Sequence, residues 1–149
     1  MEKVIGYMVT FTTYGTWLQG DKRGYVKDGQ TLKGNVQLLN ANKEAMQQAA
    51  VRLNQRQKGI VKQAILNEAK ELKQQLFAVL VWSSHVHIVA ENIDETVGKV
   101  TGRYKASAIK ALRKAGFEGK IWTKGYNKRF CFNEEELRAR IEYVNKHGE

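Results

Sequence analysis

Two apolar runs, at residues 76–82 and 85–91, most constrain what this chain can fold into. They are separated by only two serines, and they are short and rich in β-branched and aliphatic residues, as buried strands are. Neither run is long enough to span a bilayer. The two runs therefore predict either a hairpin or one bent strand at the centre of the domain.

Around this centre, the sequence predicts a first strand, several helices and a further pair of strands. Asn54 with Gln57, and Asn133 with Glu136, have the spacing of a capping box, which marks the start of a helix. Asp94 can cap another helix. In the first half of the chain, we expect a strand at 4–13, a loop at 15–40, a short helix within 41–53 and a helix from 54. After the two central runs, we expect a helix at 94–115, then strands at 120–123 and 128–132 across a turn at 124–127, and a last helix from 133. This order predicts an α+β domain of ferredoxin-like type, an antiparallel sheet with helices packed on one face.

Composition indicates a single cytoplasmic domain, residues 1–149, without contact with a membrane. The one cysteine, Cys131, cannot form an internal disulfide and fits a reducing compartment. Residues 1–14 lack the pattern of a secretion signal.

The net charge of +10 predicts a polyanion as partner, and it is concentrated in one segment. Residues 99–129 contain ten basic side chains and one acidic side chain, so we expect them to contact a phosphate backbone. Of the aromatic residues among them, Tyr126 lies in the predicted turn and is the candidate for stacking on unpaired bases. The candidate nucleic-acid-binding residues are Lys99, Arg103, Lys105, Lys110, Arg113, Lys114, Lys124, Tyr126, Lys128 and Arg129.

His85 and His87 lie two residues apart in the second apolar run, and side chains two apart in a strand point to the same face. Both imidazoles can therefore reach one divalent metal ion, while Val86 and Ile88 pack on the opposite face. The alternative is an ordinary strand face whose histidines bond to neighbouring groups. A site that activates dioxygen would also need a carboxylate, for which Glu91 is the candidate.

The third histidine, His147, follows Tyr143 by four residues on the last predicted helix. Residues four apart in a helix lie one turn above each other. Neither side chain belongs to the apolar stripe of that helix, which ends at Val144. A tyrosine beside a metal site on a very basic protein indicates phosphodiester chemistry on a nucleic acid. Tyr104 is a rival nucleophile, but it falls on the apolar side of its predicted helix.

These residues resemble a known family. His85-Val86-His87 matches the His-hydrophobe-His signature of the HUH nucleases, and residues 142–147 resemble the tyrosine helix of the single-tyrosine insertion-sequence transposases. Residues 10–24 more closely resemble the REP-associated tyrosine transposase-like proteins. The resemblance covers nearly the whole chain, although its most specific parts are short.

The resemblance implies a transposase, or a domesticated relative, that cleaves and rejoins single-stranded DNA bearing a hairpin. His85 and His87 would bind Mg²⁺ or Mn²⁺, with His147 as third ligand at a position where the family more readily has glutamine or asparagine. Tyr143 would be the nucleophile, leaving a 5′-phosphotyrosine and a free 3′-hydroxyl. Such enzymes act as dimers or as monomers, so a homodimer stays open.

Two other functions stay open. The first is a non-catalytic module that binds single-stranded nucleic acid through the basic segment, with incidental histidines. The second is a metal hydrolase or oxygenase acting on small molecules, which leaves the concentrated positive charge unexplained.

Overall fold

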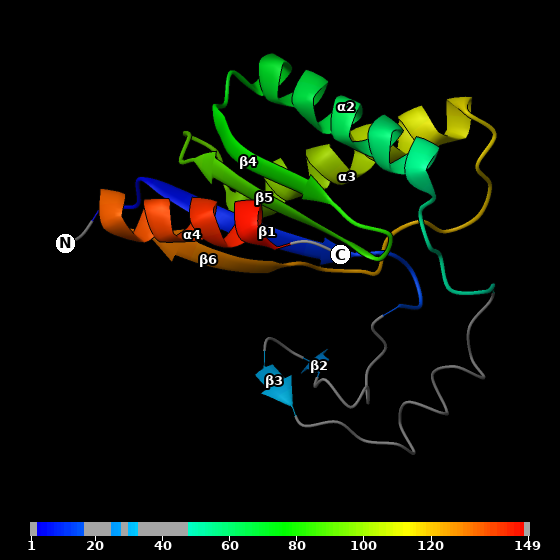
Figure 1. The fold of residues 1–149 in the computed structure, drawn as a ribbon, viewed down its shortest axis with the longest axis horizontal. Helices are drawn as coiled ribbons and strands as arrows, with labels where there is room; N and C mark the ends of the chain where they lie inside the picture. Colours follow the sequence, from blue (N-terminus) through cyan, green and yellow to red (C-terminus); the bar gives the residue numbers. More distant parts are fainter. Residues whose placement is uncertain (1–2, 17–24, 28–29, 33–47, 148–149) are drawn as a thin grey trace.

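The computed structural model describes residues 3–16, 25–27, 30–32 and 48–147, and its centre is a four-stranded antiparallel sheet in the order β4-β5-β1-β6 (Figure 1). The strands of this sheet are β1 (Gly6–Thr12), β4 (Leu76–Val81), β5 (His85–Glu91) and β6 (Asn127–Cys131). A separate two-stranded sheet pairs β2 (Tyr25–Lys27) with β3 (Gln30–Leu32). The two apolar runs thus form an antiparallel hairpin, which was one of the two predicted arrangements.

Three helices in the described part of the chain pack against the sheet, and they are α2 (Gln55–Leu72), α3 (Val97–Lys114) and α4 (Glu134–Lys146). The capping box of α2 is present, since Asn54 and Gln57 each accept the other's backbone N–H. At the start of α4, Asn133 accepts from the N–H of Glu136, whereas the Glu136 carboxylate accepts from Phe132. No helix of the described segments combines the length and apolar character needed to cross a membrane.

The main core lies on one face of the sheet, beneath α2 and α3. Tyr7, Val9 and Phe11 of β1 alternate toward this face, together with Val86 and Ile88 of β5. All five are almost completely buried, and burying a side chain of this size contributes about 1.5–3 kcal/mol. The predicted inward orientation of Val86 and Ile88 is confirmed.

Helix α4 covers the other face of the sheet (Figure 1). Its buried Val144 packs with Leu137 and Ile141 against Met8 of β1 and Val89 of β5. The α+β class and the antiparallel sheet are therefore confirmed, but the helices occupy both faces where one was expected. The reason is that residues of β4, with Met8 of β1 and Val89 of β5, give the second face an apolar patch, which the stripe of α4 covers.

The predicted hairpin between residues 120–123 and 128–132 does not form. Strand β6 instead pairs with β1 along its length, and Trp122 makes only an isolated bridge to Thr13. The intervening loop is held against α3, because Lys105 Nζ donates to the carbonyl oxygens of Thr123 and Gly125. Strand β1 is consequently paired on both sides, by β5 and by β6.

Smaller differences concern the connections. Helix α3 begins at Val97 because Thr96, and not Asp94, is its N-cap, its hydroxyl accepting from the N–H of Lys99. Residues 48–53 form no helix, and the rest of the helix predicted within 41–53 lies outside the described residues. The loop predicted at 15–40 contains the β2–β3 pair, and its other residues beyond 16 are also outside the described part.

Candidate metal centre and nucleophile

Three imidazoles from two elements meet on the α4 face of the sheet. His85 and His87 lie on β5, and His147 is the C-cap residue of α4. The ring centroids are 4.9 Å apart for His85 and His87, 5.5 Å for His87 and His147, and 6.5 Å for His85 and His147. One nitrogen of each ring lies within 4.8 Å of the others. Glu91 is not part of this group, and its carboxylate accepts from the N–H of Gln75.

His87 has the environment of a metal ligand. The side chain is only 6% exposed, and its Nδ1 lies 2.8 Å from the hydroxyl oxygen of Thr10. Its Nε2 is buried and has no hydrogen-bond partner within the described residues. Burial, reinforced by the nearby His85 and His147 rings, lowers the pKa of His87 to about 4. The ring is therefore neutral near pH 7, and in the tautomer in which Nδ1 donates its proton to Thr10, the lone pair of Nε2 is available to a cation.

Trp82, immediately after β4, contacts two of the three imidazoles. Its ring centroid is 4.2 Å from that of His85 and 4.4 Å from that of His147, and the second pair is nearly parallel at 10°. His85 also has the hydroxyl of Ser84 at 3.1 Å from its Nδ1. The two serines and Trp82 form the connection between β4 and β5, so the turn itself organises one side of the cluster.

Tyr143 lies beside the same cluster and stays accessible. Its ring is 4.9 Å from that of His147, stacked at 22°, and 6.0 Å from that of His87. The phenol side chain is 41% exposed, whereas the adjacent Val144 is buried in the contact with the sheet. One turn earlier, the guanidinium of Arg140 lies 5.4 Å from the tyrosine ring. A phenol and three imidazoles thus come together within one chain.

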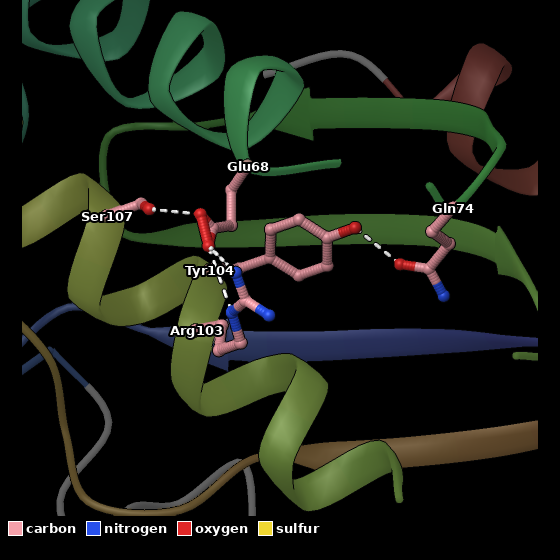
Figure 2. A network of polar contacts seen from close by, with 5 residues as sticks. All are labelled: Glu68, Gln74, Arg103, Tyr104 and Ser107. Atoms are coloured by element: carbon pink, nitrogen blue, oxygen red, sulfur yellow. Dashed lines mark hydrogen bonds and ion pairs between the residues drawn. The ribbon is translucent and has the colours of Figure 1, made fainter. Parts of the chain in front are cut away.

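Tyr104 has a structural environment, as expected from its place on the apolar side of α3. The side chain is almost fully buried, and its hydroxyl donates to the amide oxygen of Gln74 (Figure 2). Gln74 in turn donates to the hydroxyl of Tyr7 at 2.8 Å. Burial raises the pKa of Tyr104, so its phenol is neither reachable by a polymer nor readily ionised.

The predicted DNA-contacting residues differ in their availability. Arg103 forms an ion pair with Glu68 at 2.8 Å, and the same carboxylate accepts from the hydroxyl of Ser107 (Figure 2). Lys105 is half-buried by its carbonyl contacts, and this burial lowers its pKa. The exposed members of the predicted set are Lys99, Arg103, Lys110, Arg113, Lys114, Lys124, Tyr126, Lys128 and Arg129.

These cations do not all share a face with the histidines. Helix α3 packs on the main-core face, opposite the cluster. On β6, Arg129 pairs with Met8, so its side chain shares the α4 face, while Lys128 projects to the other side. Arg129 is therefore the predicted cation that the sheet places on the face of the imidazoles.

Two residues of the site, Thr10 and Trp82, were not predicted. Thr10 reaches His87 only because β1 and β5 pair in one register, which a single sequence does not reveal. Trp82 lies three residues before His85, across a turn, so the period-two pattern of a strand does not connect them. The available signal was a large aromatic residue in the short connection next to the histidines.

The solved structures with a similar fold include two transposases. A REP-associated tyrosine transposase bound to a REP hairpin aligns with a TM-score of 0.55 and 12% identity over 97% of this chain and 67% of its own. A proposed transposase from Deinococcus radiodurans R1 aligns with a TM-score of 0.50 and 11% identity over all of this chain and 95% of its own. No family model and no curated protein matches the sequence. The expected likeness to these transposases is thus confirmed in the fold.

Proposed function

We propose that this chain is a metal-dependent DNA strand transferase, a transposase or a relative of one, that cleaves and rejoins single-stranded DNA bearing a hairpin. The observation that carries the proposal is the meeting of an accessible tyrosine, Tyr143, with three imidazoles in one chain. The transposase fold supports DNA as the substrate, and the hairpin bound in one of the similar structures supports a hairpin-bearing strand.

Tyr143 acts as the nucleophile in this proposal. Its phenolic oxygen forms a bond to the phosphorus of a backbone phosphate, and the bond from phosphorus to the 3′ oxygen breaks. The phenolic proton passes to solvent, and the departing 3′ oxygen takes one up. The products are a strand end attached to the protein as a 5′-phosphotyrosine and a free 3′-hydroxyl, so the phosphodiester energy is conserved for rejoining. Because the tyrosine side chain is 41% exposed, a strand can reach it without opening the core.

His85, His87 and His147 are the residues that would hold a divalent cation. Such an ion, when bound, stabilises negative charge on the phosphate. The buried Nε2 of His87 fits this role, because a buried ring nitrogen without a hydrogen-bond partner in the described structure can be satisfied by a metal. Donor chemistry favours Mn²⁺ over Mg²⁺, since Mg²⁺ prefers oxygen ligands and all three donors are nitrogens.

We assign contacts with the phosphate backbone to the exposed cations of α3 and β6, and base stacking to Tyr126. Within this set, Arg129 is the cation of the sheet whose side chain projects from the same face as His87. Lys105 is excluded from the assignment, since its ammonium group is bonded to two carbonyl oxygens.

The test is formation of a covalent adduct. The protein is incubated with Mn²⁺ and a library of labelled single strands that carry a hairpin next to a randomised segment, and adducts that survive denaturing electrophoresis are collected. We expect an adduct with the wild type and with Tyr104→Phe, whose ring is buried, and none with Tyr143→Phe.

An adduct that persists in Tyr143→Phe would reject the role of that residue. If the wild type forms no adduct with any strand, and strand binding is unaffected by His85→Ala with His87→Ala, the non-catalytic binding module is the better description. Both outcomes require that each variant unfolds at a temperature close to that of the wild type.

A further inference from the structure

Trp82, His147 and Tyr143 form a run of stacked rings across the candidate site. The rings of Trp82 and His147 are 4.4 Å apart with an interplanar angle of 10°, and those of His147 and Tyr143 are 4.9 Å apart at 22°. Trp82 belongs to the connection between β4 and β5, Tyr143 belongs to α4, and His147 is the C-cap residue of that helix. The stack therefore joins the turn that precedes the histidine pair to the helix that carries the tyrosine.

The orientation of the His147 ring depends on this stack, whereas the other two imidazoles also have a hydroxyl group beside them. His87 is held by Thr10, and His85 has the hydroxyl of Ser84 beside it. His147 lies beyond the last helical residue of α4, where its backbone N–H donates to Val144 at 3.3 Å. Its ring makes no hydrogen bond to any part of the chain that the structure describes. Stacking on Trp82 and Tyr143 is thus what orients this ring.

We infer that Trp82 is a positioning residue, which orients His147 as the third metal ligand and, through the same stack, holds the ring of Tyr143 at the site. The inference rests on the proposed function of the histidine cluster. An imidazole that donates its lone pair to a cation becomes electron-poor, and an electron-poor ring is attracted more strongly to the face of an indole. Binding of a metal ion by the three histidines should consequently restrict the motion of the Tyr143 ring.

The first measurement is the affinity for Mn²⁺ by calorimetry. Trp82→Leu retains apolar volume but removes the aromatic face, Trp82→Phe retains a smaller face, and Trp122→Phe is the matched control, because Trp122 packs edge-on against Phe11 in the main core. An aromatic contact contributes about 0.5–1.5 kcal/mol, so Trp82→Leu should bind Mn²⁺ roughly two- to tenfold more weakly. Trp82→Phe should recover most of the loss, and Trp122→Phe should bind like the wild type.

The second measurement follows Tyr143 itself by NMR of isotope-labelled tyrosine, with Zn²⁺ as a diamagnetic ion and Tyr143→Phe to assign the signal. Zn²⁺ should shift and sharpen the Tyr143 resonance in the wild type and in Trp82→Phe. In Trp82→Leu saturated with Zn²⁺, that response should be lost. A purely structural role of Trp82 would lower the unfolding temperature without uncoupling this resonance from the ion.

The inference is overturned if Trp82→Leu binds Mn²⁺ with unchanged affinity, or if its Tyr143 resonance responds to Zn²⁺ as in the wild type. Absence of Mn²⁺ binding by the wild type would instead reject the proposed function. Should Trp82→Leu fail to fold, the double variant Trp17→Phe with Trp122→Phe leaves Trp82 as the sole tryptophan of the chain. Paramagnetic Mn²⁺ should then quench its emission in step with occupancy, and unquenched emission at saturation would overturn the inference.

Discussion

Thr10 of β1 lies directly opposite His87 of β5, and its hydroxyl oxygen is 2.8 Å from Nδ1 of the imidazole. This contact occupies one nitrogen of the buried ring and leaves Nε2 as the available donor atom. Outer contacts of this kind orient a ligand before any ion arrives, and their loss typically lowers metal affinity. The central strand thus takes part in the site although it contributes no ligand of its own.

Substitution of Thr10 should test this relationship. Thr10→Val preserves the shape of the side chain and removes the hydroxyl, so we expect Mn²⁺ affinity to fall by about tenfold. Thr12→Val is the matched control, since Thr12 lies opposite His85 on the same face and its hydroxyl makes no hydrogen bond among the described residues. Calorimetric titration of both variants is the measurement. An equal loss in the two would show that the hydrogen bond to His87 is not the cause.

The low pKa of His87 predicts a dependence of stability on pH. Burial, and then the neighbouring rings, lower this pKa from 6.5 to about 4, so the unfolded chain takes up the proton at a higher pH than the folded chain. The free energy of unfolding should therefore fall as the pH decreases from about 6.5 to about 4. Urea unfolding in metal-free buffer over this range measures it. His87→Gln, which lacks the titrating group, should show a shallower fall, and an identical pH dependence in both proteins would contradict the prediction.

Gly6 should be intolerant of any side chain. A Cβ built there would lie 2.8 Å from the backbone carbonyl oxygen of Ala90 and 2.9 Å from Cδ1 of Leu137, so β1 and β5 would have to shift at this point and the Leu137 side chain would have to move. We expect Gly6→Ala to destabilise the fold by about 1–3 kcal/mol. Gly59→Ala, in an open position of α2, should instead stabilise it by about 0.5–1 kcal/mol. Thermal unfolding of the two variants is the measurement, and a neutral Gly6→Ala would contradict the close approach of Gly6 to the Ala90 carbonyl.

Arg129 should contribute to strand binding through charge alone. The side chain is exposed on the face of the histidines, so Arg129→Gln should weaken binding to single-stranded DNA similarly for all sequences. The slope of log affinity against log salt should decrease by about 0.7 if one phosphate contact is lost. Lys62→Gln, exposed on α2 over the opposite face, is the control. The assignment is rejected if both variants lose affinity equally.

The sequence predicted those features whose signals are local. Asn54 and Gln57 lie within one helical turn, so their capping box could be recognised without knowledge of the fold. The same holds for the shared face of His85 and His87, which depends only on the period of a strand. That Tyr143 and His147 would join this pair was expected from the resemblance to transposases, and their convergence is now seen in the structure.

Features set by pairing between distant segments could not be predicted in this way. Strand β6 contains apolar and charged residues that fit a hairpin with 120–123 as well as they fit β1, and only the assembled sheet decides. The contact of Thr10 with His87 likewise follows from the register between β1 and β5. The contact of Trp82 with His147 follows from the path of the turn after β4. The second apolar face, beneath α4, was missed because it is assembled from β4, Met8 of β1 and Val89 of β5, and the sequence does not show that these strands lie side by side.

The sheet carries its main core on one face and the histidine cluster on the other, so the layer that keeps the chain folded is largely separate from the layer proposed to do chemistry. Replacement of the tyrosine or of an imidazole would leave the larger layer intact. A variant without the proposed activity would then still be a folded, positively charged domain. An architecture of this kind lets the proposed site change, or disappear, without loss of the fold that presents the positive charge.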